Sequence, residues 1–234
     1  MKPTPPRLLP LLSGTAAGSL DPVDLVEIGI SAAAVDIVEL ALGIGLDAVD
    51  RLGGLAALTG WDGPLVAVGR TTTAAPAATG WRARSLPWLV SDRDGVWELR
   101  SSLDGGTTRL ALAELSDRAR RLGAEPAASL SPFGVEVQEW MGGEPPPRAL
   151  VVSGMAQDAA RRGRFWTGSE WADLGLAASE APDGPLVAGC GCRACSIASR
   201  GYLSHLLAMR EITAEHLLGW HNLHQLRLRV EGPS

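Results

Sequence analysis

The sequence has 234 residues, of which 46% are hydrophobic and 20% are charged, and its formal net charge is −5 at pH 7. This composition is sufficient for a folded core and excludes a mainly disordered chain. The acidic excess argues against unaided binding to nucleic acid, because phosphate neutralisation needs Lys and Arg gathered on one face.

The sequence of the amino-terminal region predicts neither an export signal nor a membrane span. Residues 1–12 are rich in proline and lack the continuous apolar run of a signal peptide. The apolar stretch 25–49 is interrupted by the acidic residues Glu27, Asp36, Glu39 and Asp47. We therefore predict a cytoplasmic protein that makes no contact with a membrane.

Strands and helices are predicted to alternate along the first half of the chain, which is typical of an α/β fold. Asp21 is expected to cap a helix that starts at Pro22. The predicted elements are a strand or hairpin at 8–20, the helix at 22–28, a strand at 35–42, a helix at 45–58 broken by Gly53-Gly54, a strand at 65–68, and a strand at 107–110 after a turn at 104–106.

The cysteines and histidines are confined to the carboxy-terminal part of the chain. All three cysteines, Cys190, Cys192 and Cys195, lie within six positions, and all four histidines lie within the next thirty. Thiolate and imidazole groups are the donors that a tetrahedral zinc ion prefers, and three Cys with one His form a common structural site. We predict one structural Zn²⁺, because four protein donors leave no position open for water.

Two helices, at 196–209 and 213–230, are predicted after the cysteines from the spacing of their leucines. Thr213 is predicted to be the N-cap of the second helix. If that helix folds back beside the first, His221 returns to the level of the cysteines and is the best fourth ligand. His216 and His224 remain competitors, whereas His205 lies on the outgoing helix.

Two other interpretations of this cluster carry no metal. The cysteines can be small buried hydrophobic residues, or two of them can form a disulfide in an oxidising compartment. A histidine on an apolar helix face is often an ordinary core residue.

The segment 190–207, followed by Glu211-Ile212 and His221-Asn222-Leu223, resembles the zinc-binding end of the tRNA-guanine transglycosylase family. These enzymes exchange a guanine in tRNA for a deazaguanine base on the way to queuosine or archaeosine. Their zinc ligands match Cys190, Cys192, Cys195 and His221. The segments around Gly53-Gly54 and 61–65 also resemble the family, so the likeness covers both ends of the chain.

The resemblance fails at the positions that carry the family's catalysis. Family members have an Asp-Ser-Gly motif after the Pro-Leu strand, where this chain has Val68-Gly69-Arg70. The segment 149–167 resembles the one that holds the nucleophilic aspartate, and that position is Val152 here. The family's Asn-Thr motif falls on Asp36-Ile37. Glycosyl exchange needs a carboxylate at the sugar and a second group for the proton, so valine supports neither step.

The length predicts an incomplete barrel. A closed (β/α) TIM-type barrel takes about 250 residues without an added zinc module. We therefore expect an α/β fold with a partial, abbreviated barrel region at 1–180 and a zinc-binding helical module at 181–234. The segment 131–147 is expected to bridge the missing barrel units.

Two arginine clusters are candidates for contact with tRNA phosphates. The first comprises Arg118, Arg120 and Arg121. The second comprises Arg161, Arg162 and Arg164, and it matches a basic segment of the family. In both cases arginines exposed to solvent on a helix are the simpler interpretation.

Three functions follow as hypotheses. The favoured one is a catalytically degenerate transglycosylase relative, a non-catalytic partner or tRNA-binding subunit in queuosine-type modification.

The family forms dimers partly through the zinc end, so the partner is expected to be a second copy or a full-length transglycosylase. The interface is expected to use the leucines of the module helices and Trp220. The alternatives are an active enzyme with a relocated carboxylate, at Asp36, Asp104 or Asp158, and a zinc-stapled scaffold.

Overall fold

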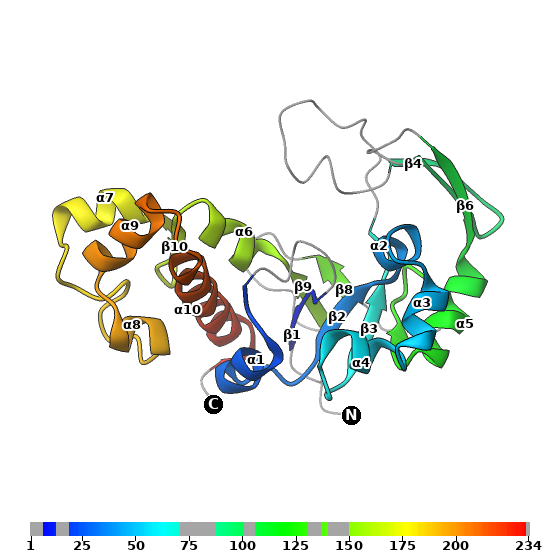
Figure 1. Cartoon of the computed structure of the whole chain (residues 1–234), viewed down its shortest axis with the longest axis horizontal. Coiled ribbons are helices and arrows are strands. Elements are labelled where there is room, and N and C mark those ends of the chain that lie inside the picture. The colour runs from blue at the N-terminus through cyan, green and yellow to red at the C-terminus, as the bar shows by residue number, and fades with distance from the viewer. Residues whose placement is uncertain are drawn as a thin grey trace. The chain divides into compact units, whose positions relative to one another are not determined.

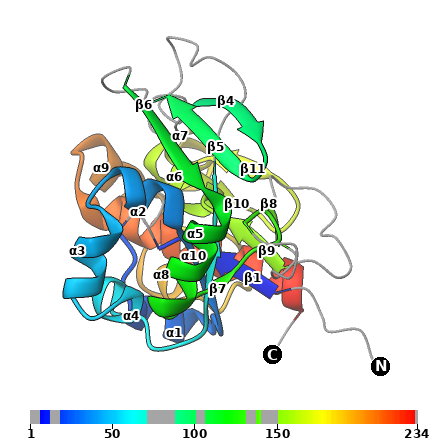
Figure 2. The same cartoon turned by 90° about the vertical axis from the view of Figure 1, so that its right-hand side faces the viewer.

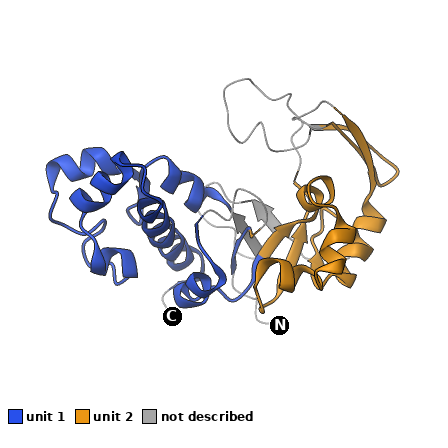
Figure 3. Ribbon diagram, viewed as in Figure 1, with its two compact units in different colours: residues 1–11, 15–33, 138–234 blue, residues 12–14, 34–137 orange. Residues whose placement is uncertain are grey.

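The computed structural model describes residues 7–12, 19–70, 88–100, 106–130, 137–139 and 150–232. The chain forms two compact units (Figure 3): unit 1 comprises residues 1–11, 15–33 and 138–234, and unit 2 comprises residues 12–14 and 34–137. Residues 138–180 and the helices that follow belong to the same unit. The division predicted at residues 180 and 181 stays a prediction.

The described strands form four small sheets, and helices follow several of them, so the predicted mixed α/β class is confirmed. In unit 1, β1 (Arg7–Pro10) pairs in parallel with β9 (Leu150–Ser153). In unit 2, β3 (Leu65–Val68) pairs in parallel with β7 (Glu125–Pro126). Parallel pairs of this kind need crossover connections, which is typical of βα units. These described strands do not close into a barrel, and the partial barrel stays a prediction.

The remaining strands extend these sheets or form sheets of their own. They are β2 (Ala33–Asp36) beside β3, β8 (Val137–Glu139) beside β9, the antiparallel pair β10 (Arg164–Trp166) and β11 (Trp171–Asp173), and the antiparallel sheet β4 (Trp88–Arg93), β5 (Val96–Arg100) and β6 (Thr107–Ala111). Figure 2 shows β4, β5 and β6 lying side by side, with α5 continuing from β6. The predicted strand at 107–110 is confirmed, whereas most of the predicted turn at 104–106 lies outside the described residues.

Unit 1 is built around its last helix (Figure 1). Helix α10 (Ile212–Glu231) packs against α6 (Met155–Arg161), α8 (Arg193–Ile197), α9 (Arg200–Ala208), β10 and β1. Helix α7 (Leu174–Glu180) packs on α9, and α1 (Pro22–Ile28) packs on α10. A helix in contact with this many elements buries most of its circumference, and the buried residues of α10 include Leu218, Leu223 and Leu226.

Helix α1 begins as predicted. The Asp21 carboxylate accepts the Asp24 backbone N–H at 2.9 Å, and the Asp24 carboxylate accepts the Asp21 backbone N–H at 3.0 Å. This reciprocal pair satisfies two amide groups that the helix itself leaves free. Pro22 occupies the first turn, where its missing N–H costs nothing.

Two predictions about the module helices are wrong. The single helix predicted at 196–209 is interrupted, because α8 ends at Ile197 and Ser199 caps α9 by accepting the Tyr202 N–H at 3.3 Å. Thr213 is not an N-cap, since α10 already begins at Ile212. The chain reverses at Arg210, which has a φ of 59°, and the next helix starts immediately after this left-handed turn.

The broken helix predicted at 45–58 is confirmed in unit 2. Helices α3 (Leu46–Arg51) and α4 (Leu55–Thr59) are separated by Gly53 and Gly54, whose φ values of 99° and 95° suit only glycine. The strand predicted at 35–42 is wrong beyond residue 36, because α2 (Ile37–Leu42) starts there. Asp36 Oδ1 accepts the N–H groups of Val38 and Glu39, both at 3.1 Å, and this cap turns the chain from strand to helix.

Helix α5 (Leu112–Arg121) completes unit 2. It buries Leu115, Ser116 and Ala119 on one face and ends in three arginines. Every helix in the described part of the chain is too short or too polar to cross a membrane.

Candidate metal centre

The loop before α8 and the middle of α10 bring four potential metal ligands together. The ligand atoms of Cys190, Cys192, Cys195 and His221 all lie within 4.8 Å of one another. None of these cysteines is in a disulfide. Of the four histidines, His221 is the one that joins this group among the described residues, as the fold-back of the second helix predicted.

Short local structure sets the spacing of the three sulfurs. Cys192 is the N-cap of α8, and its Sγ accepts the Cys195 backbone N–H at 3.4 Å. One turn of helix therefore places the two sulfurs on the same side. Cys190 precedes this turn, and its Sγ accepts a hydrogen bond from Gln225 Nε2 at 3.0 Å.

The distances fit one tetrahedral ion. His221 Nδ1 lies 3.8 Å from Cys190 Sγ and 3.4 Å from the sulfurs of Cys192 and Cys195. Ligands bound to one zinc at its usual bond lengths have roughly 3.5 Å between sulfur and nitrogen. Three thiolates and one imidazole are also the donor set that zinc prefers, so the residues present fit a structural Zn²⁺.

The orientation of the His221 ring is fixed by a hydrogen bond at the nitrogen that faces away from the cysteines. Its Nε2 lies 2.9 Å from the carbonyl oxygen of Trp166, which can only accept, so Nε2 carries the hydrogen. The lone pair of the neutral ring is therefore on Nδ1, facing the sulfurs. Histidine ligands usually have such a partner on the nitrogen that does not bind the metal.

Hydrogen bonds within the cluster shift the pKa values of two thiols in opposite directions, lowering that of Cys190 and raising that of Cys192. Hydrogen bonds from Cys192 and Cys195 lower the pKa of Cys190, and His221 adds to this effect. Burial on its own would lower the pKa of His221, but its hydrogen bonds with Cys190 and Cys195 raise that pKa to about 9. A metal ion binds the thiolates and the neutral ring, so its binding here would release protons from these groups.

Asn222 ties the helix of this centre to the neighbouring strand. Its Oδ1 accepts the Trp166 N–H at 2.9 Å, and its Nδ2 donates to the carbonyl oxygens of Ala156 at 3.1 Å and Arg164 at 3.0 Å. Asn222 is completely buried. Neither Asn222 nor Gln225 was predicted to have a role. Gln225 is four residues after His221, and this i, i+4 spacing is a signal that points to a shared helix face.

The other histidines have different neighbours. His216 Nδ1 lies 3.0 Å from the Ser19 carbonyl oxygen, and its Nε2 lies 3.5 Å from Asp24 Oδ1. His224 stacks on Trp220 with ring centroids 5.6 Å apart. His205 is exposed on α9.

The arginines expected to meet nucleic acid divide into two kinds. Arg161 pairs with Glu215 through its Nε at 2.9 Å and with Asp158 through its Nη1 at 3.6 Å, so its charge is already matched. Arg162 and Arg164 are exposed, and Arg164 Nη2 donates to the Trp171 carbonyl oxygen at 3.1 Å.

Both positions that resemble catalytic carboxylates in the family lie on strands. Val68 is the buried last residue of β3. Val152 lies in β9, in register with Leu9 of β1. The glycine between Val68 and Arg70 is enclosed, since a Cβ at Gly69 would lie 2.8 Å from Leu130 and 2.9 Å from the Trp97 ring. A serine does not fit at that position without a shift of its neighbours.

A carboxyl group with a raised pKa lies on β2, the strand beside β3. Asp36 ends β2 and is completely buried, and the Arg70 backbone N–H hydrogen-bonds to its carboxylate. Burial raises the pKa of Asp36 to about 7, although the Glu39 backbone N–H and the Arg70 charge oppose the rise. Burial also raises the pKa of Glu39. Asp158 is engaged with Arg161, and Asp104 lies outside the described residues.

This geometry defines an α/β protein with a Cys₃His metal-type centre in its carboxy-terminal helices. Residues 150–231 match the family model described as Queuine tRNA-ribosyltransferase. This segment contains all four residues of the centre, and over it the chain is similar to the tRNA-guanine transglycosylase family.

Three queuine tRNA-ribosyltransferases are similar to the chain over different lengths. The protein of Cereibacter sphaeroides is 30% identical over 181 residues, which are 65% of this chain and 48% of that protein. The protein of Desulforapulum autotrophicum is 34% identical over 93 residues, 36% of this chain and 25% of that protein. The protein of Ruegeria pomeroyi is 44% identical over 48 residues, 20% of this chain and 13% of that protein. The chain thus spans about half the length of the first of these relatives, and less of the others.

Proposed function

We propose that this protein acts in queuosine-type tRNA modification as a transglycosylase-like subunit that does not itself exchange bases. One observation carries the proposal. The four residues of the metal centre are complete, whereas Val68 and Val152 occupy the two strand positions that the family resemblance assigns to carboxylates. Valine neither attacks an anomeric carbon nor transfers a proton.

Incorporation of labelled guanine into tRNA tests this proposal. The purified full chain is expected to give no exchange above a protein-free control, because nucleophilic and acid–base contributions are lost together. Acid–base catalysis alone contributes about a hundredfold or more. Exchange at a rate typical of an enzyme contradicts the proposal.

A tRNA-binding role assigns phosphate contact to Arg162 and Arg164. Both side chains are exposed, whereas Arg161 is held by Glu215 and Asp158. The double variant Arg162→Ala/Arg164→Ala is expected to weaken tRNA binding and to flatten its salt dependence, since each lost phosphate contact reduces the slope by about 0.7 to 0.9. The matched control is Arg229→Ala on α10. If both variants bind tRNA with equal affinity, Arg162 and Arg164 do not contact its phosphates.

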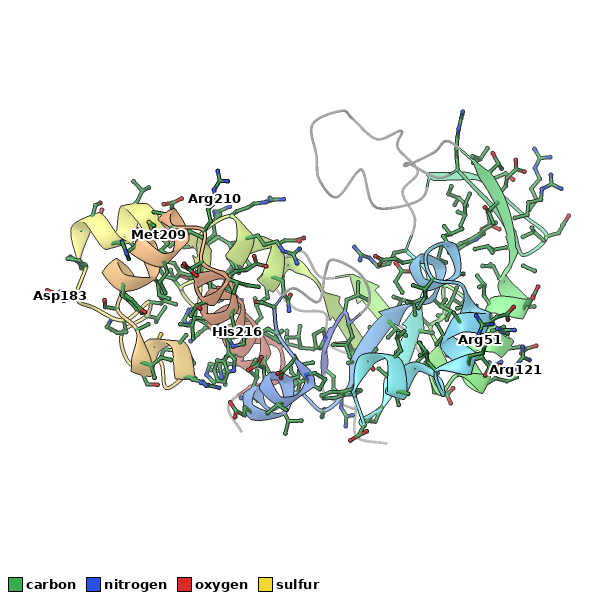
Figure 4. All side chains as sticks on the ribbon, viewed as in Figure 1. Arg51, Arg121, Asp183, Met209, Arg210 and His216 are labelled. Carbon is green, nitrogen blue, oxygen red and sulfur yellow. The ribbon has the colours of Figure 1, made fainter. Side chains whose placement is uncertain are left out.

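The partner role also needs an apolar surface, and most of the predicted one is buried, although Leu206 and Leu207 are half-buried. Leu203, Leu217, Leu218 and Trp220 are buried inside the module and are not available to a partner. The exposed apolar side chains of the same helices are Ile197, Tyr202, Met209 and Ile212, which are 61%, 53%, 63% and 70% exposed. Figure 4 marks Met209 at the end of α9, beside Arg210.

A homodimer, or a heterodimer with a full-length transglycosylase, is the partnership that we propose for these side chains. Light scattering of the purified chain, alone and mixed with the transglycosylase of the same organism, measures it. Met209→Asp/Ile212→Asp should abolish association, whereas Val90→Asp, on the exposed face of β4 in unit 2, should leave it intact. A monomer in both samples contradicts the partner role and favours the zinc-stapled scaffold over it.

A second function, base exchange with a relocated carboxylate, is favoured by the environment of Asp36. A general acid or base works best with a pKa near the working pH, and burial brings that of Asp36 to about 7. The neighbouring Arg70 offers a guanidinium for an oxygen atom of a substrate. If exchange is observed, Asp36→Asn should reduce it at least a hundredfold, whereas Asp173→Asn, which alters a similar helix cap at an exposed position, should not.

A further inference from the structure

Unit 2 contains a cavity of about 490 Å³ that is separate from the metal centre and from Asp36. Its walls are the end of α2 with the turn that follows, the helix α3, the strand β6 and the first turns of α5. We call it the arginine hollow. Its volume lies in the range of about 300–1,000 Å³ that is usual for small-molecule sites.

Part of the lining of the arginine hollow is apolar, and we call this part its apolar floor. Ile44, Leu46, Leu110 and Leu115 line it together with small alanine side chains. Ile44 is 52% exposed although it is a large hydrophobic residue. An apolar floor between a helix pair and a strand suits the face of a planar ring, which gains free energy when both surfaces leave water.

Three arginines from three different elements line the same space. They are Arg51 at the end of α3, Arg109 on β6 and Arg118 on α5. Arg51 makes no ion pair with any described residue. Arg109 pairs with Glu98 at 3.3 Å, but its side chain is 76% exposed. Exposed pairs of this type contribute little, so a bound anion can replace them.

Arg118 is the most sheltered of the three, with its side chain 22% exposed. It forms an ion pair with Asp47 of α3, whose side chain is 80% exposed. Figure 4 labels Arg51 on this side of unit 2 and Arg121 at the end of α5. Arg121 lies outside the lining of the hollow, which makes it a control on the same helix.

The charges select one class of ligand. Guanidinium groups bind phosphate through paired, charge-assisted hydrogen bonds, and a tetrahedral phosphate can receive them from several directions. Glu114 lies one helical turn before Arg118 and also lines the hollow. Its carboxylate can accept hydrogen bonds from neighbouring hydroxyl groups, as acidic residues do from a ribose.

We propose that the arginine hollow binds a mononucleotide, with the base on the apolar floor, the ribose hydroxyls at Glu114 and the phosphate among Arg51, Arg109 and Arg118. A long RNA strand is a poorer match. Asp47 and Glu114 repel a continuous row of phosphates, and the whole chain has a net charge of −5.

Isothermal titration of the full chain with GMP and AMP tests the proposal, with guanosine, inorganic phosphate and tRNA as comparison ligands. At least one nucleotide should bind, and its affinity should exceed that of guanosine and of inorganic phosphate about tenfold or more, because each of these lacks half of the contacts. Arg51→Ala and Arg109→Ala should each weaken nucleotide binding about tenfold, as expected for a charge-assisted hydrogen bond. Arg121→Ala should bind like the unchanged protein.

Several results would overturn the proposal. If neither nucleotide binds at millimolar concentration, the proposed site does not exist. Equal affinity for inorganic phosphate reduces it to an anion site, and tighter competition by tRNA assigns the arginines to RNA instead. If Arg121→Ala and Arg51→Ala lose the same amount of nucleotide affinity, the nucleotide responds to the overall positive charge and not to a specific site. Because Arg51 and Arg109 are exposed, circular dichroism should show both variants folded. Guanine exchange and tRNA binding are separate measurements, so this inference and the proposed function can fail independently.

Discussion

The carbonyl oxygen of Trp166 accepts a hydrogen bond from His221 Nε2 at 2.9 Å, and this contact decides which ring nitrogen faces the cysteines. The bond joins β10 to α10, so the strand and the helix hold the imidazole in a single orientation. Phe165 adds an edge contact to the same ring, with centroids 6.1 Å apart. The fourth position of the metal centre is therefore prepared before any ion binds.

We predict one zinc ion per chain, bound through the three cysteines and His221 Nδ1. His221→Ala should lose most of the metal, measured by elemental analysis of purified protein. Chelation of the unchanged protein should destabilise unit 1, since α10 packs on α6, β10 and β1. His224→Ala and His205→Ala are the controls. Full zinc content in His221→Ala, with loss in His224→Ala, shows that the ligand assignment is wrong.

Gln225 is predicted to support the metal through Cys190. Its Nε2 donates to Cys190 Sγ at 3.0 Å, which stabilises negative charge on that sulfur. Gln225→Ala should lower the affinity for zinc by about 10- to 100-fold, the usual effect of losing a hydrogen bond to a ligand. Competition with a chelator of known affinity measures this. Gln225→Glu is a second variant, which should weaken binding further because it places an acceptor against the sulfur. An unchanged affinity in both variants limits Gln225 to packing.

Asn222 is predicted to be one of the most sensitive positions for stability. Asn222→Ala leaves the Trp166 N–H and the carbonyl oxygens of Ala156 and Arg164 buried without their partner. Each unsatisfied buried group costs about 1–3 kcal/mol, so a loss of at least about 3 kcal/mol in the free energy of unfolding is expected.

Urea denaturation of zinc-loaded protein measures the effect of Asn222→Ala. Asn222→Asp is the informative comparison, because its carboxylate keeps the acceptor for Trp166 but loses both donated bonds and buries a charge. It should be destabilised as well. A loss below about 1 kcal/mol in either variant means that these groups find water or other partners.

The metal centre could be predicted from the sequence because its signals are local. The interval between the cysteines and the return of a helical histidine are both set by helix geometry, which the leucine spacing of 213–230 indicates. The start of α10 was predicted one residue late. The left-handed turn at Arg210 could not be predicted, because glycine is the residue that usually indicates such a turn and none is present there. The contacts of Asn222 and Trp166 were not predictable, because they join segments 56 residues apart.

Unit 2 shows a different limit. The apolar run at 35–42 has the composition of a strand, and the buried cap at Asp36 changes it into a helix after one residue. Asp36 is an ordinary helix-capping residue type, so its burial beside Arg70 follows from the pairing of β2 with β3 and not from local sequence. The arginine hollow likewise combines Arg51, Arg109 and Arg118 from distant segments, of which only Arg118 belonged to a cluster visible in the sequence.

Asp36 is predicted to make stability fall as the pH rises from about 4 to about 7. In the unfolded chain this carboxyl ionises near its ordinary pKa of 3.8, whereas in the fold burial raises the pKa to about 7. Between these values the folded protein keeps a proton that the unfolded chain has released. The free energy of unfolding therefore decreases with pH, by about 1.4 kcal/mol for each unit from this group alone.

Asp36→Asn isolates that contribution, because asparagine can still accept the N–H groups of Val38 and Glu39 but does not titrate. Glu39 and Arg70 face the same carboxyl, and both are unchanged in this variant. Denaturation at pH 5, 6, 7 and 8 should show the unchanged protein losing stability relative to Asp36→Asn up to about pH 7, and a constant difference above it. Parallel stability curves across that range would mean that Asp36 is ionised in the folded protein, and they would also remove the argument for Asp36 as an acid–base group.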